Sequence, residues 1–144
     1  ISIHGNGEPC SCGNRGCLEL YAGANVVRDR LRLELGIDAD FESLCGMWQR
    51  KEVDAALRQM AEDLSVALVS AVNLLQPELI VLGYEAIFLP QRYVDYLEEL
   101  VNRRKFIRDA QRTVVKKAHF GTDAQLVGAA ANLLSQVFSG KILF

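Results

Sequence analysis

The sequence predicts an α/β fold, and three observations support this prediction. A helical apolar pattern runs through residues 51–75, an apolar segment without alternation follows at residues 79–82, and a second strand-like segment at residues 113–120 precedes another helical pattern. Strands that alternate with helices are typical of α/β proteins with a parallel sheet. The chain has 144 residues, half of them hydrophobic, which suffices for one globular core.

Helical periodicity dominates the first half of the chain. In residues 18–35 apolar side chains recur at helical spacing, and Gly36 follows as the residue expected to end that helix. A short polar helix is expected over residues 41–49. The long helix predicted at residues 51–75 carries an apolar stripe formed by Val53, Leu57, Met60, Leu64, Leu68, Ala71 and Leu75.

The predicted strands lie in the second half of the chain. Pro77 is expected to end the long helix. Residues 79–82 should form a strand that is buried on both faces, because the segment is apolar without alternation. A helix over about residues 89–101 then leads to a second strand within residues 113–120.

A last helix is predicted after the second strand. Thr122, followed by Gln125 three residues later, predicts a capping box at its start. Small residues at positions 128–131 would allow close packing of its backbone against another element. The sequence contains no internal repeat and no stretch of linker composition that would divide the chain.

Composition and charge exclude several classes of protein. Lys and Arg number 16 against 18 Asp and Glu, so this chain has no basic stripe for the phosphates of DNA. It has no apolar run of membrane-spanning length and no secretory signal pattern, and we therefore expect a cytoplasmic protein that does not bind membranes. The chain begins in what reads as the end of a strand, without an initiator methionine, so we expect it to be part of a longer protein.

Three of the four cysteines lie within eight residues of one another, in the segment GEPCSCGNRGCLE at residues 7–19. Their spacing is C-x-C-x4-C, and two glycines allow the backbone to curl so that the sulfurs of Cys10, Cys12 and Cys17 converge. A cluster of thiolates suits zinc, which is tetrahedral at structural sites and needs a fourth ligand. The segment is therefore a candidate zinc loop.

The residues by themselves leave the fourth ligand and the role of the thiols open. His4 is the only histidine near the cluster and is the candidate fourth ligand. Free thiols in a reducing cytosol, or a redox pair, are the alternatives to a metal. Cys45, alone in a helical segment near Trp48, is expected to be a small buried hydrophobic residue.

The cysteine segment resembles the signature C-x-C-G-x-x-G-C-L-E of the ROK family, which comprises sugar-responsive bacterial repressors and sugar kinases. The similarity continues in the same order through NLLQPELIVLG and GTDAQLVGAAANLL, so it extends over essentially the whole chain. This resemblance implies the C-terminal portion of an actin-like, ribonuclease-H-like ATPase-type α/β fold. Within it, residues 1–17 would form the zinc loop, residues 18–76 a helical segment and residues 77–144 an α/β segment.

The resemblance also implies roles for individual residues. Cys10, Cys12 and Cys17 match the three thiolates of a structural zinc site. The histidine of that site would fall immediately before Ile1, so His4 does not match it and reads as a loop residue. Glu19 matches an acid that contacts hydroxyls of the bound sugar, and an ionised carboxylate can accept hydrogen bonds from two hydroxyls. The plainer alternative for Glu19 is an acid that favours the positive end of a helix.

The two branches of the family differ after the strand that matches IVLG. Kinases of the family usually carry paired glycines there, where the backbone approaches ATP, whereas here Gly83 is followed by Tyr84 and Glu85. A bulky ring and a negative charge are both unfavourable beside a triphosphate. The sequence therefore favours the repressor branch. The alternative is the C-terminal half of a sugar kinase that uses Mg-ATP, whose catalytic base would lie upstream of this chain.

The resulting hypothesis is the effector-binding and oligomerisation portion of a sugar-responsive transcriptional repressor. Its expected partners are a sugar or sugar phosphate, further copies of the protein, and DNA through an N-terminal winged-helix domain that is absent from this chain. A stand-alone zinc-stabilised interaction module is a third interpretation. We expect this chain on its own to self-associate, because strands without their neighbours leave apolar surfaces uncovered.

Overall fold

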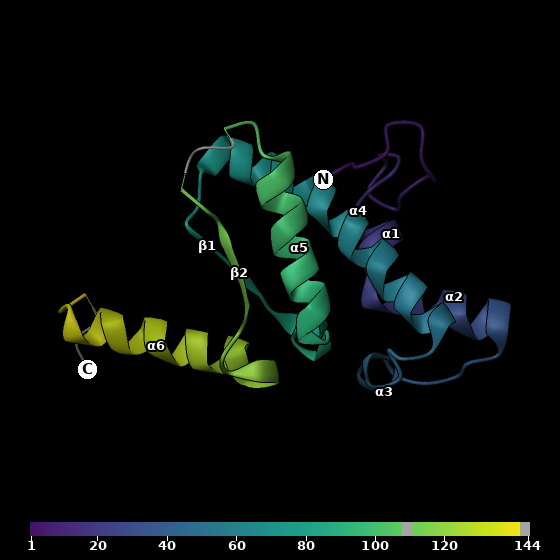
Figure 1. The fold of residues 1–144 in the computed structure, drawn as a ribbon. Coiled ribbons are helices and arrows are strands. Elements are labelled where there is room, and N and C mark those ends of the chain that lie inside the picture. The colour runs from purple at the N-terminus through teal and green to yellow at the C-terminus, as the bar shows by residue number, and fades with distance from the viewer. Residues whose placement is uncertain (108–110, 142–144) are drawn as a thin grey trace.

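The computed structural model describes residues 1–107 and 111–141, with Thr122 described by its backbone alone. Figure 1 shows α4 running through the molecule, α5 beside it, and α6 at the opposite end from α2 and α3. The elements in chain order are α1 (Glu19–Ala22), α2 (Ala24–Leu35), α3 (Phe41–Gly46), α4 (Lys51–Leu75), β1 (Leu79–Leu82), the 3-10 helix η1 (Tyr84–Phe88), α5 (Gln91–Arg104), β2 (Val114–Lys117), the 3-10 helix η2 (Gly121–Asp123) and α6 (Ala124–Phe138).

Helix α4 is the centre of the fold. It contacts α1, α2, α3 and, most extensively, α5. Its bounds are those predicted from the periodicity, and the stripe positions Val53, Leu57 and Met60 are buried. The core ends at Val72, since Leu74 and Leu75 at the end of the helix are 82% and 77% exposed. None of the described helices, α4 included, is long and apolar enough to cross a membrane.

The helix predicted over residues 18–35 is two helices. Gly23 lies between α1 and α2 with an extended backbone, at a ψ of 141°, so the helical hydrogen bonding is interrupted there. The predicted end is confirmed, because Gly36 adopts a left-handed φ of 65° and its amide bonds back to the last turn of α2. Helix α3 ends at Gly46 and is shorter than the predicted segment, and the Asp40 side chain caps its start.

The two strands pair in parallel, with Leu79 opposite Val114. Helix α5 packs against β2 and covers one face of this small sheet. The prediction that residues 79–82 are buried on both faces is wrong. Leu82 is buried, whereas Leu79 and Val81 are 49% and 56% exposed. Alternate side chains of a strand point to opposite faces, and nothing in the described part of the chain covers the second face of β1.

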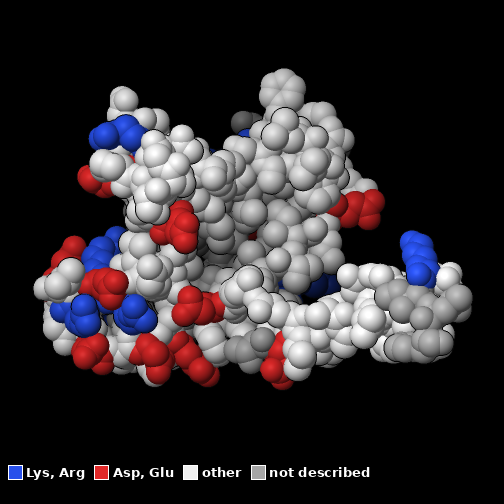
Figure 2. Space-filling view, turned by 180° about the vertical axis from the view of Figure 1, so that it is seen from behind, with Lys and Arg blue, Asp and Glu red and all other residues white. Residues whose placement is uncertain are grey.

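Helix α6 extends away from the core. It begins at Ala124, after η2, and has no side-chain cap; the side chain of Thr122, on which the predicted capping box depends, lies outside the described residues. No residue of α6 is buried, and the predicted close packing of its small residues is not made within the described chain, where Gly128 faces open space. In Figure 2 α6 is a largely uncharged arm, and charged side chains crowd the other end of the molecule.

Candidate metal centre

The cysteine loop is a small hairpin closed by backbone hydrogen bonds. An antiparallel bridge joins Ser2 to Cys17 and brings the two ends of the loop together. Inside the loop the amide of Cys10 donates to the carbonyl of Asn14 at 2.8 Å, and the amide of Gly13 donates to the carbonyl of Cys10 at 3.0 Å. These bonds form a tight turn that carries the first two cysteines toward the third.

Two glycines make this backbone path accessible, as the sequence predicts. Gly13 and Gly16 adopt left-handed φ values of 89° and 62°. A Cβ atom on Gly16 would overlap the carbonyl oxygen of His4, and the amide of Ile3 donates to the Gly16 carbonyl at 2.8 Å. Only glycine allows the two arms of the loop to approach so closely at this position.

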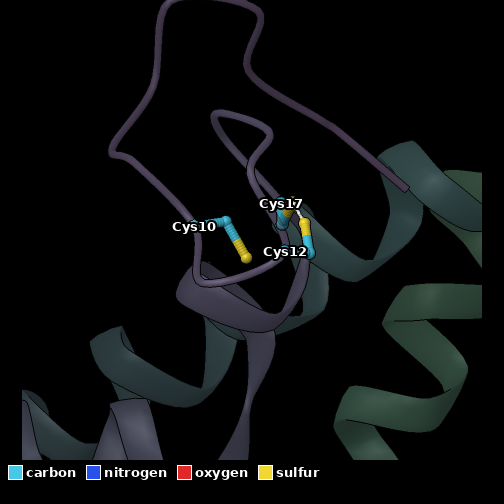
Figure 3. Close-up of side chains that lie close together, drawn as sticks. All are labelled: Cys10, Cys12 and Cys17. Carbon is cyan, nitrogen blue, oxygen red and sulfur yellow. Dashed lines mark hydrogen bonds between the residues drawn. The ribbon is translucent and has the colours of Figure 1, made fainter.

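The loop gathers the three predicted sulfurs at one point. The Sγ atoms of Cys10, Cys12 and Cys17 all lie within 4.8 Å of one another, and Figure 3 shows the three side chains gathered together. The Sγ atoms of Cys12 and Cys17 are 3.5 Å apart. Cys17 is buried under the loop, whereas Cys12 is exposed to solvent. The arrangement could hold a metal ion with three sulfur ligands.

The close contact separates the pKa values of the thiols. Hydrogen bonds from the backbone of Asn14, and then from Cys10 and Cys17, lower the pKa of Cys12 to about 7. Hydrogen bonds with Cys10 and then Cys12, together with burial, raise the pKa of Cys17 to about 11. Three thiolates this close repel one another, and a divalent cation between them would favour the ionised form of each. Sulfur ligands of this kind fit zinc.

His4 is not part of the sulfur group. Its Nε2 atom faces Oδ1 of Asp63 on α4 at 3.6 Å, and its ring packs edge-on against Tyr21 of α1, with 4.6 Å between the ring centroids. The candidacy of His4 as fourth ligand, which rested on proximity in sequence, therefore has no support in the geometry. The assignment of His4 as a loop residue agrees with its position between α1 and α4.

Glu19 is the first residue of α1 and follows Cys17 after a single leucine. Its side chain is exposed. Among the described residues, its carboxylate has no hydrogen-bond or ion-pair partner. The loop thus presents a free carboxylate close to its last sulfur.

Cys45 has the structural role that the sequence predicts. It is 3% exposed in the core cluster, and Trp48 packs against the same cluster. Burial raises the pKa of its thiol to about 12, so it stays protonated and apolar at neutral pH.

The turn after β1 places a tyrosine in a backbone conformation that usually favours glycine. Tyr84 has a left-handed φ of 52°, a conformation that glycine adopts readily, and its side chain is 77% exposed. Tyr84 and Glu85 line a hollow of about 180 Å³ together with Phe88, Gly121 and Ala124, at the point where η2 leads into α6. A ring and a carboxylate therefore border the end of β1.

Two residues near the site were missed by sequence reasoning. Tyr21 and Asp63 contact His4 from α1 and α4. The signal for Asp63 was an acid on the apolar side of a predicted helix, where only 7% of it is exposed in the structure. Tyr21 gave no signal beyond its closeness to Glu19, because its partners lie at the other end of the loop.

A family model described as the ROK family matches residues 1–136. This chain belongs to the ROK family. Repressors and kinases both occur among its ROK relatives. A xylose repressor of Caldicellulosiruptor bescii is 23% identical over 153 residues, which cover 96% of this chain and 38% of the repressor. An N-acetyl-D-glucosamine kinase of Pasteurella multocida is 26% identical over 132 residues, which cover 88% of this chain and 42% of the kinase.

This ROK chain thus spans about two fifths of the length of these relatives. Among solved structures, the ROK hexokinase from Thermus thermophilus superposes with a TM-score of 0.73 at 25% identity, covering 91% of this chain and 46% of the hexokinase. The likeness confirms the predicted actin-like ATPase-type fold.

Proposed function

We propose that this ROK chain is the sugar-binding and oligomerisation portion of a sugar-responsive transcriptional repressor. The observation that carries the proposal is the pair Tyr84 and Glu85, which line the hollow between the end of β1 and the start of α6. The family resemblance assigns that place in the kinases to paired glycines beside ATP. The tyrosine ring takes up volume there, and the carboxylate repels phosphate oxygens. The xylose repressor whose similarity covers 96% of this chain supports the same branch.

Glu19 is the proposed sugar-contact residue. Its carboxylate is exposed and without a partner among the described residues, so its oxygens are available to accept hydrogen bonds from two hydroxyls of a sugar. Recognition of this kind needs no covalent bond to be made or broken. D-xylose is the first candidate, because relatives of this chain are xylose repressors, and a phosphorylated sugar is a variant of the same chemistry.

Cys10, Cys12 and Cys17 are the proposed ligands of a structural zinc. The ion, when bound, would close the loop by linking its three sulfurs to a fourth ligand, which the resemblance places immediately before Ile1. The loop in turn holds the start of α1, where Glu19 follows Cys17 after one residue. Residues 1–17 would then form a rigid support for sugar recognition, with residues 18–76 as the helical segment and 77–144 as the α/β segment.

The proposed regulation is allosteric. DNA would bind through a winged-helix domain preceding this chain, in a cytoplasmic homo-oligomer. Sugar must bind one global state of the protein more tightly than the other, and DNA must bind the second state more tightly. Each ligand then weakens the binding of the other by the same factor.

A second candidate is the C-terminal half of a sugar kinase that uses Mg-ATP. It is favoured by the likeness to the ROK hexokinase, at a TM-score of 0.73 and 25% identity. The two candidates share the sugar site and the zinc loop, and they differ in the use of ATP.

The test is a titration of the whole protein with D-xylose, D-glucose and N-acetyl-D-glucosamine, with and without Mg-ATP, by calorimetry and thermal shift, followed by assays of DNA binding and of sugar phosphorylation with the same sugars. The repressor proposal expects a sugar to bind, ATP to add nothing, and operator DNA to be released by the sugar. Glu19→Gln should weaken sugar binding, whereas Glu8→Gln, which changes another exposed acid of the loop, should not. ATP-dependent phosphorylation of any of these sugars would overturn the repressor proposal and establish the kinase.

A further inference from the structure

We propose that Tyr21 is a positioning residue for Glu19, which holds α1 in place against the cysteine loop without contributing to the metal site. The inference rests on the proposed function of Glu19 in sugar binding and deepens it, because it names a residue that acts on the sugar only through Glu19. Three features of the molecule support this role: the weakness of α1, the contacts of the Tyr21 hydroxyl, and the contacts of its ring.

Helix α1 cannot hold its own orientation. It has only 4 residues, buries none of them and has no side-chain cap. Isolated helices shorter than about 12 residues are marginal in water, because nucleation fixes several dihedral angles for one hydrogen bond. Gly23 separates α1 from α2, so α2 does not extend its hydrogen bonding. The orientation of α1, and with it the position of Glu19, must therefore be set by contacts from outside the helix, which include its packing against α4 and α2.

The Tyr21 hydroxyl supplies the first of these contacts. It accepts a hydrogen bond from the backbone amide of Glu8 at 3.0 Å, across thirteen residues of sequence. The hydroxyl lies against Gly7, where a Cβ atom would collide with it and would also come within 2.7 Å of the Cα atom of Gly16. The hydroxyl thus occupies a slot that a side chain at position 7 would fill, and it links α1 to the arm of the loop that carries Gly7 and Glu8.

The Tyr21 ring supplies the second contact. His4 packs edge-on against it at a centroid distance of 4.6 Å and an interplanar angle of 75°. The other side of His4 faces Asp63 on α4 at 3.6 Å, and Asp63 is 7% exposed and accepts from Gln59 at 3.3 Å. The unit of loop and α1 is thereby connected to the central helix of the fold.

These contacts are separate from the sulfur cluster. The three sulfurs face one another inside the loop, whereas Tyr21 contacts the backbone of Glu8 and the ring of His4, neither of which belongs to the cluster. Loss of the Tyr21 hydroxyl should therefore leave metal binding intact and loosen only the connection between the loop and α1. This separation makes the proposal testable.

The experiment compares Tyr21→Phe with Tyr96→Phe in the whole protein. Tyr96 is a matched control. Its hydroxyl, on α5, donates a hydrogen bond to the carboxylate of Glu62 on α4 at 2.8 Å, so this contact joins two helices and does not involve the loop. The readouts are zinc content, hydrogen exchange at the Glu8 amide, and the dissociation constant of whichever sugar in the D-xylose, D-glucose and N-acetyl-D-glucosamine panel binds most tightly. We expect Tyr21→Phe to raise that constant about three- to tenfold, as for the loss of one hydrogen bond. Zinc content should not change, and the Glu8 amide should exchange faster.

A double-mutant cycle with Glu19→Gln separates positioning from general destabilisation. If Tyr21 acts through Glu19, Tyr21→Phe should have little further effect on sugar affinity once Glu19 is changed. Unaltered affinity of Tyr21→Phe, an effect that adds in full to that of Glu19→Gln, an equal effect of Tyr96→Phe, or loss of zinc from Tyr21→Phe would each overturn the inference. If Glu19→Gln binds sugar as the unchanged protein does, or no sugar binds at all, the proposed function fails and this inference falls with it.

Discussion

The carboxylate of Glu98 on α5 accepts a hydrogen bond from the backbone amide of Val115 on β2, at 2.8 Å. The other carboxylate oxygen accepts from two nitrogens of Arg112, at 2.6 and 2.9 Å. Burial acts to raise the pKa of Glu98, but the hydrogen bonds from Val115 and Arg112 outweigh it and hold the pKa below its ordinary value. The ionised Glu98 side chain thus connects α5 to the small sheet through hydrogen bonds.

Glu98→Gln should destabilise the protein at pH 7 and have little effect in acid. The pKa of Glu98 is lowered by folding, so its contribution is complete above the unfolded pKa of about 4.3 and is lost as the pH falls through the folded value. We expect a loss of about 1.5–3 kcal/mol in the free energy of unfolding at pH 7, as for hydrogen bonds to a charged group. Urea unfolding of the whole protein at pH 7 and at a series of lower pH values measures the loss of stability and its decline in acid.

The neighbouring Glu99 is the control for this prediction. Its side chain is 65% exposed and pairs with Arg103 at 3.6 Å on the surface of α5. Exposed pairs of this kind contribute about 1 kcal/mol or less. Equal effects of Glu98→Gln and Glu99→Gln, or an effect of Glu98→Gln that does not decrease as the pH is lowered from 7 into the acid range, would contradict the role assigned to Glu98.

Zinc binding should depend on pH and release protons. Metal ligands must be thiolates, and the pKa is about 7 for Cys12 and about 11 for Cys17 before metal binds. Affinity should therefore fall as the pH decreases through 7, and protons should still be released at pH 8. Calorimetric zinc titrations of the whole protein in two buffers of different ionisation enthalpy measure the number of protons released when zinc binds.

Replacement of Cys10, Cys12 and Cys17 by serine should abolish zinc binding and lower the melting temperature. Cys45→Ala is the control, since Cys45 is buried in the core away from the loop and should change stability without changing metal content. Zinc that remains bound to the triple variant would refute the assignment of the loop as the metal site.

Gly16→Ala should disrupt the cysteine loop. The left-handed φ of 62° costs about 1–2 kcal/mol for a residue with a side chain, and the new Cβ atom would overlap the carbonyl of His4. We expect reduced zinc content and a lower melting temperature. Gly5→Ala is a matched control in the same loop, because its Cβ atom would meet nothing within 4 Å. Normal metal content in Gly16→Ala would show that the loop can close another way.

This chain on its own should self-associate. Leu79 and Val81 are exposed on β1, and Leu133, Leu134 and Phe138 are exposed on α6. Exposed apolar surface and unpaired strand edges favour association. Analytical ultracentrifugation of this chain should detect oligomers. Replacing Leu133 and Leu134 with Lys should reduce the oligomer fraction. Leu33→Lys on α2 is the control: Leu33 is 79% exposed, and its replacement should leave the oligomer fraction unchanged. A monomer at all concentrations would be the contrary result.

The sequence by itself determined the parts of this protein that depend on near neighbours along the chain. The apolar stripe placed α4 at Lys51–Leu75, and the spacing of the cysteines and glycines predicted that three sulfurs converge. Gly36 marked the end of α2 because only a local left-handed turn was needed there. In each case the periodicity or the turn chemistry acts over a few residues, so the sequence contains the whole cause.

The tertiary structure decided what depends on residues far apart in the chain. The apolar run at residues 79–82 predicted that β1 is buried on both faces, but one face of β1 is exposed in the structure. Burial of that face would require another element to pack on it. The tertiary structure also separated His4 from the sulfurs and placed it between Tyr21 and Asp63. Proximity along the chain favoured His4 as a ligand, but the packing of the loop and α1 against α4 determined its neighbours.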